Sequence, residues 1–197
     1  DMAVLYRTNS QSRALEEEFR RAGIPYRLIG AISFYDRREV KDLLAYLRLI
    51  ANPQDDEAFL RAISVPKRGL GESGLATLAE AAAKWGKSLL DTSEAAEMVQ
   101  GLRPGVREGL RKFASLIKDL RERAETWTPA QILEQVITSI DYEKVLLAEG
   151  PEGMDRWENV RELVASAADW SEVVTPEEDD PTTPLERFLA EAALLSA

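Results

Sequence analysis

The 197-residue sequence contains no cysteine and no histidine. Without cysteine there is no disulfide framework, which is typical of a reducing compartment. Without histidine the chain lacks the commonest general base and metal ligand, so the usual zinc sites and Ser-His-Asp or Cys-His catalysis are excluded. The sequence also lacks a GxxxxGK[ST] phosphate loop and any apolar run near the ~20 residues of a membrane span. These absences argue against an autonomous enzyme and against a membrane protein.

Positive charge is also scarce. The net charge is −10, which argues against bulk binding of nucleic acid. The scarcity is uneven, because residues 1–75 hold 12 Lys/Arg against 11 Asp/Glu, whereas residues 76–197 hold 13 against 24. Basic side chains that suit a polyanion are therefore concentrated in the N-terminal part.

The first thirty residues show strand-like and helical patterns in turn. The short apolar run at 2–6 predicts a buried strand, and apolar residues at helical spacing after it predict a helix that ends at 22–23. Residues 24–29 predict a second strand, which completes a βαβ unit. Two parallel strands do not make a stable sheet alone. We therefore expect this unit to belong to a larger α/β domain and to be the least stable part of the chain.

Helical periodicity dominates after residue 37. Val40, Leu43, Leu44 and Leu47 follow the i, i+3, i+4, i+7 spacing of an amphipathic helix over 38–49. Proline and glycine punctuate the remainder, and further helices are expected at 55–63, 74–85, 87–99, 104–125, 128–138, 140–148, 152–170 and 184–196. An acidic, proline-rich loop is expected at 175–184. The pattern predicts a mainly α fold.

The stretch SVPKRGLGESGL at 64–75 combines a basic pair, a Gly-Leu-Gly turn and a helix start. Glycines let a backbone approach a phosphate, and a helix N-terminus offers unpaired N–H groups and a positive dipole end. Residues 67–71 are therefore a candidate grip on a nucleic-acid backbone, although by itself the pattern favours a plain interhelical turn. A similar but weaker turn at 101–106, followed by Arg107 and Arg111, is also more simply a connection.

Several distinctive segments follow one another along the chain. They are AVLYRTNSQSRALEE at 3–17, IPY at 24–26, SFYDRREVKD at 33–42, YLRLI at 46–50, PKRGLG at 66–71, WENVREL at 157–163 and PLERFL at 184–189. In this order they resemble segments of the UvrD/PcrA/Rep superfamily 1 DNA helicases. Together they span essentially the whole chain.

The resemblance implies a part of a larger helicase. Residues 1–29 resemble the end of the first segment of the RecA-like subdomain 2A, a short βαβ remnant. Residues 30–197 resemble the helical 2B subdomain with its helix-hairpin-helix-like element, and Gly30 is implied as the hinge between the two. ATP and Mg²⁺ are expected in the parent helicase and neither in this part, which is expected to hold no catalytic or metal-ligating residue.

The resemblance also implies roles for individual residues. Arg7, at the end of a 2A strand, is expected to contact a single-strand phosphate. Lys41, on the first 2B helix, is expected to reach duplex phosphate or else to pair with Glu39 or Asp42. Ser73 is expected to replace the hydroxyl that several relatives carry where Gly74 stands. The element that grips duplex backbone is implied to consist of Lys67, Arg68, Gly69, Leu70 and Gly71.

Two functions of different classes remain after this reading. The first is a duplex-DNA-binding and regulatory 2B portion of an ATP-dependent 3′–5′ DNA helicase of repair or replication, not catalytic alone. Its expected partners are a single-strand/double-strand DNA junction and the rest of the helicase chain, in the cytoplasm. The second is an acidic helical module that recruits repair or transcription proteins.

Overall fold

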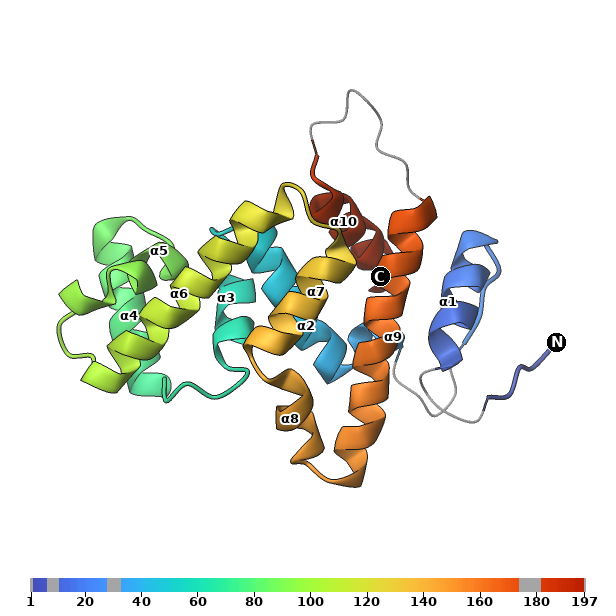
Figure 1. Cartoon of the computed structure of the whole chain (residues 1–197), viewed down its shortest axis with the longest axis horizontal. Coiled ribbons are helices and arrows are strands. Elements are labelled where there is room, and N and C mark those ends of the chain that lie inside the picture. The colour runs from blue at the N-terminus through green and yellow to red at the C-terminus, as the bar shows by residue number, and fades with distance from the viewer. Residues whose placement is uncertain (1, 7–10, 28–32, 174–181, 197) are drawn as a thin grey trace.

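The computed structural model describes residues 2–6, 11–27, 33–173 and 182–196. Helices dominate the described residues (Figure 1). They are α1 (Ser12–Arg21), the 3₁₀ turn η2 (Phe34–Asp36), α2 (Arg38–Ala51), α3 (Asp56–Ile63), α4 (Glu72–Trp85), α5 (Leu89–Glu94), the 3₁₀ turn η3 (Ala96–Met98), α6 (Pro104–Ala124), α7 (Pro129–Ser139), α8 (Tyr142–Leu147), α9 (Pro151–Val173) and α10 (Pro184–Ser196). The predicted mainly α fold is confirmed, and no helix among these residues is long and apolar enough to cross a bilayer.

The predicted βαβ unit is not formed in the described residues. Residues 2–6 and 24–27 have no strand conformation, and only the helix between them, α1, is present. A strand exists only through its ladder to a neighbour, and an isolated pair is marginal in water. Leu5 is 94% exposed, so the apolar run that suggested a buried strand is not covered by other described residues.

Helix α2 lies at the centre of the molecule and contacts α3, α6, α7, α9 and α10. Its predicted stripe is confirmed, because Val40, Leu43 and Leu47 are fully buried and Leu44 is half-buried. Each such side chain contributes roughly 1.5–3 kcal/mol by leaving water. The helices around α2 therefore share one core.

Local capping explains several helix starts. The Asp55 carboxylate accepts a hydrogen bond from the Ala58 N–H at 2.9 Å, so α3 begins where the sequence predicts. Thr128 and Gln131 form a reciprocal capping box at the start of α7, followed by a proline at its first position. Such signals are local, and for this reason most predicted boundaries fall within a few residues of the observed ones. The exception is the helix predicted at 87–99, which is divided into α5 and η3.

Helices α4 and α5 and the first part of α6 make one end of the molecule, and α3 lies between that end and α2 (Figure 1). Phe59 of α3 and Phe113 of α6 are buried and meet edge to face, with ring centroids 5.6 Å apart. This aromatic contact packs α3 against α6. Ala62 and Ile63, the last residues of α3, are also buried, so the turn that connects α3 to α4 begins at the core.

Helix α1 lies beside α9 and is joined to the helical body through buried polar groups (Figure 1). The Glu16 carboxylate accepts from the Ser33 hydroxyl at 2.7 Å, and Arg13 pairs with Glu162 at 2.6 Å. Arg37 donates to Ser12. The implied division at residues 29–30 and the implied hinge, Gly30, lie outside the described residues. The structure therefore adds a polar contact between the two predicted parts that the sequence did not reveal.

Candidate nucleic-acid interface

The connection between α3 and α4 presents its backbone at the surface. Lys67, Gly69, Gly71 and Ser73 are exposed. Gly69 has a φ of +74°, a conformation that other residues adopt only with strain. A Cβ at Gly69 or Gly71 would meet nothing within 4 Å, so the space in front of both glycines is open to a ligand.

The start of α4 is left uncapped by side chains. Gly71 is the N-cap residue, and no side chain accepts a hydrogen bond there. The first N–H groups of any helix have no intrahelical partner, and the dipole places positive charge at this end. With Lys67 nearby in the chain, this end of α4 suits an anion such as a phosphate.

Arg68 lies differently from Lys67, because its guanidinium faces the protein. Its Nη1 lies 3.0–3.2 Å from four backbone carbonyl oxygens, those of Ala62, Ile63, Val65 and Pro66. Its Nη2 donates to the Tyr46 hydroxyl at 2.7 Å, and its Cζ lies 4.8 Å from the centre of the Phe113 ring. The Tyr46 hydroxyl donates in turn to the Val65 carbonyl, and burial raises the pKa of this phenol to about 12. The Arg68 guanidinium, which the sequence predicted to contact DNA, thus forms its hydrogen bonds within the fold.

Leu70 and Gly74 pack against each other on the inner side of the turn. Leu70 packs against the core, and a Cβ at Gly74 would lie 3.0 Å from its Cδ1. A hydroxyl residue at position 74 would therefore crowd Leu70. The neighbouring Ser73 is exposed, while its carbonyl oxygen accepts from the Thr77 hydroxyl at 2.9 Å.

Lys41 and Arg7, the other two residues predicted to contact DNA, do not form part of this turn. Lys41 is half-exposed and pairs with Asp36 at 2.6 Å, instead of with the two acids that the sequence suggested. Those two acids have other partners, since Glu39 accepts a hydrogen bond from Asn159 and Asp42 accepts one from Arg61. Arg7 lies outside the described residues.

The second glycine turn, at 101–106, lies against α4, which the sequence did not reveal. A Cβ at Gly101 would lie 3.5 Å from Thr77 of α4, and one at Gly109 of α6 would lie 3.4 Å from the Arg68 carbonyl oxygen. At the start of α6, Arg103 is exposed. No spacing rule relates residues this far apart in the chain, so only the tertiary structure could show this contact.

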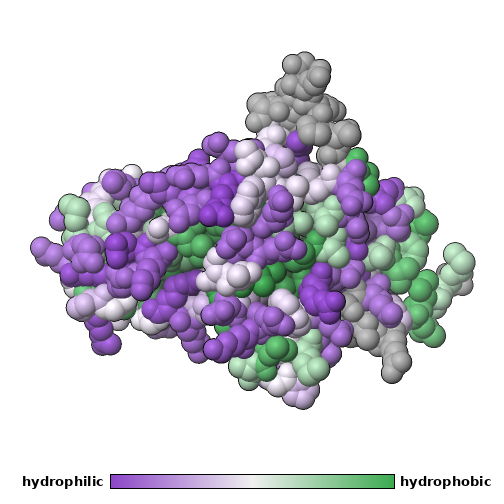
Figure 2. Space-filling model, viewed as in Figure 1, coloured by the Kyte–Doolittle hydropathy of each residue, from purple (hydrophilic) through white to green (hydrophobic). Residues whose placement is uncertain are grey.

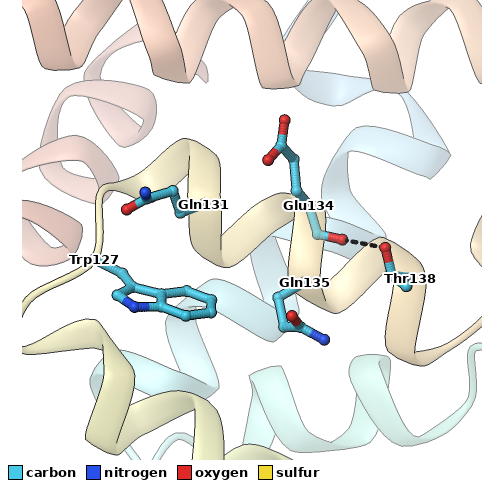
Figure 3. A pocket seen from close by; sticks show the side chains of 5 residues that line it. All are labelled: Trp127, Gln131, Glu134, Gln135 and Thr138. Carbon is cyan, nitrogen blue, oxygen red and sulfur yellow. Dashed lines mark hydrogen bonds between the residues drawn. The ribbon is translucent and has the colours of Figure 1, made fainter.

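A separate cavity of about 300 Å³ lies along α7, lined by Trp127, Gln131, Glu134, Gln135 and Thr138 (Figure 3). The Thr138 hydroxyl donates to the Glu134 carbonyl oxygen at 2.8 Å. The lining holds a carboxylate and no basic side chain, so it is unsuited to phosphate. Among the described residues, no cluster of three or more Asp, Glu, His or Cys side chains is arranged to hold a metal ion.

Within the described residues, the structure thus combines a helical body with an exposed, glycine-rich turn before an uncapped helix, an arrangement that suits an anion. The chain matches the UvrD-like helicase C-terminal domain over residues 1–197 and belongs to this family. It is 38% identical to the ATP-dependent DNA helicase PcrA of Staphylococcus aureus and 35% identical to that of Bacillus subtilis, each over all 197 residues. The PcrA of Leuconostoc citreum is 34% identical over the same length.

The match covers 100% of this chain but only 26% of each of these relatives. The chain therefore corresponds to about a quarter of a UvrD/PcrA-type helicase, and the resemblance seen in the sequence is confirmed.

Proposed function

We propose that this chain is the duplex-DNA-binding and regulatory 2B portion, with the end of 2A, of an ATP-dependent 3′–5′ DNA helicase. ATP and Mg²⁺ belong to the rest of the parent enzyme, and Gly30 serves as the pivot between 2A and 2B. The partners are a single-strand/double-strand junction and the rest of the helicase chain. Family membership and the PcrA relatives support the class of protein.

The exposed turn before α4 is the observation that carries the duplex-binding role. Gly69 and Gly71 leave open space in front of the backbone, and the uncapped N–H groups of α4 are ready to donate to phosphate oxygens. Lys67 adds an exposed positive charge, and Ser73 adds an exposed hydroxyl. Contacts of this kind hold the backbone of any sequence and read no base.

A net charge of −10 makes the expected affinity low. Duplex binding should also weaken as the salt concentration rises, because each phosphate contact releases counterions. In this proposal Arg7 and Lys41 supply further phosphate contacts outside the turn.

Replacing Lys67 with glutamine tests the role. We expect weaker binding to a fluorescein-labelled duplex and a salt slope lower by about one unit, because one phosphate contact is lost. Lys84→Gln is the matched control, since Lys84 is an exposed lysine near the other end of α4, roughly 18 Å from the helix start. Equal slopes for the two variants would refute the role of the turn.

A second function, recruitment of repair or transcription proteins, is favoured by the tip formed by α8 and α9. Leu147 is 43% exposed and Met154 is 62% exposed there, beside Glu143 and Glu152. Figure 2 shows hydrophobic surface at this lower edge of the molecule, whereas the left end, formed by α4, α5 and α6, is largely hydrophilic. A chain with negligible duplex affinity at every salt concentration would support this function over the first.

A further inference from the structure

The Arg68 side chain connects three parts of the fold. Through Tyr46 it is joined to α2, through the Phe113 ring to α6, and through carbonyl oxygens to the end of α3 and the start of the turn. Arginine is always charged and has five N–H donors in a fixed planar fork. Four carbonyl acceptors and one hydroxyl surround that fork here.

A phosphate at Nη1 or Nη2 of Arg68 would compete with these partners. Charge-assisted hydrogen bonds would be lost, and the carbonyl oxygens at the end of α3 would lose their donor. The Arg68 backbone also lies close to α6, since a Cβ at Gly109 would be 3.4 Å from the Arg68 carbonyl oxygen. Lys67, the preceding residue, has no such constraint and is exposed.

We propose that Arg68 is a positioning residue, whose side chain fixes the shape of the 66–71 turn and does not contact phosphate itself. The proposal deepens the duplex-binding role and rests on it. By holding the carbonyls of Val65 and Pro66, Arg68 sets the direction in which Lys67, Gly69 and Gly71 are presented to DNA.

The first experiment needs no DNA. Amide ¹⁵N–¹H signals of Gly69 and Gly71 report the shape of the turn, and we compare the wild-type chain with Arg68→Lys and Tyr46→Phe. Both variants keep the charge of position 68 but weaken its fork of hydrogen bonds, so both glycine signals should shift. Tyr142→Phe is the control, because it also removes a hydroxyl from a buried tyrosine, one that bonds to Asp42. Glycine signals that stay in place in both test variants would overturn the proposal.

The second experiment measures binding to the labelled duplex as a function of salt. Lysine pairs with phosphate as a point charge, so Arg68→Lys would keep most of its affinity if residue 68 held phosphate through its charge alone. We expect instead that Arg68→Lys lowers affinity by about tenfold or more, because the charge-assisted bonds that shape the turn are lost. Tyr46→Phe should weaken binding in the same direction, whereas Tyr142→Phe should bind as the wild type does.

The two proposals fail in different ways. If Lys67→Gln leaves the salt slope unchanged, the duplex-binding role is wrong, and the glycine signals still decide whether Arg68 shapes the turn. If Lys67→Gln lowers the slope while Arg68→Lys and Tyr46→Phe bind normally, the positioning role alone is wrong. Should Arg68→Lys fail to fold, the comparison of Tyr46→Phe with Tyr142→Phe decides, since each loses one buried hydroxyl.

Discussion

Replacing Glu16 with glutamine should release α1 from the helical body. The residues that α1 buries are Ser12, Arg13 and Glu16, all of them polar. A ten-residue helix is marginal in water on its own, so these contacts decide whether α1 stays docked. Glu16 lies at their centre, because its carboxylate accepts from the Ser33 hydroxyl at 2.7 Å and from the Phe34 N–H at 3.3 Å.

The expected magnitude follows from the charge of that acceptor. A hydrogen bond to a charged group contributes about 1.5–3 kcal/mol, so its weakening should lower the free energy of local opening by a similar amount. Amides of α1 should then exchange roughly 10- to 150-fold faster, at about 1.4 kcal/mol for each factor of ten. Exchange in α2, which lies in the core, should not change.

Hydrogen exchange detected by mass spectrometry or NMR measures this directly. Glu18→Gln is the control, since Glu18 lies on the same helix but is exposed and pairs only with the exposed Arg21 among the described ion pairs. An unchanged rate in α1, or an equal change in both variants, would refute the reasoning. In the wild-type monomer, exchange at 3–6 and 25–27 slower than in α2 would contradict the further expectation that residues 1–29 are the least stable part.

Two more perturbations test the core and the absence of independent catalysis. Phe113→Ala should lower the free energy of unfolding by roughly 3–5 kcal/mol, because the ring is buried and meets Tyr46, Phe59 and Arg68. Urea unfolding measures this loss. A loss below about 1 kcal/mol would contradict the expectation and mean that the cavity collapses. The chain alone should neither bind nor hydrolyse ATP, with or without DNA, since its sequence has no phosphate loop; turnover that persists through repeated purification would contradict this.

Most of the helical fold is predictable from local patterns. The apolar stripe of α2, the Asp55 cap and the prolines at 104, 129 and 184 are short-range signals, so each marks its helix without knowledge of the rest of the chain. The strand predictions at 2–6 and 24–29 rested on the same kind of signal and were wrong in the described residues. A strand depends on a partner that no local pattern supplies.

The sequence by itself determined the helix boundaries, the family and the presence of a glycine turn with two basic residues at 67–68. Only the tertiary structure decided what each of those two residues does. Tyr46 and Phe113 are 22 and 45 positions away from Arg68, yet they hold its guanidinium inside the fold and leave Lys67 exposed. Packing also brought the turn at 101–106 against α4 and placed Glu16 among donors from η2. Such contacts depend on distances between elements far apart in the chain, which composition and periodicity do not contain.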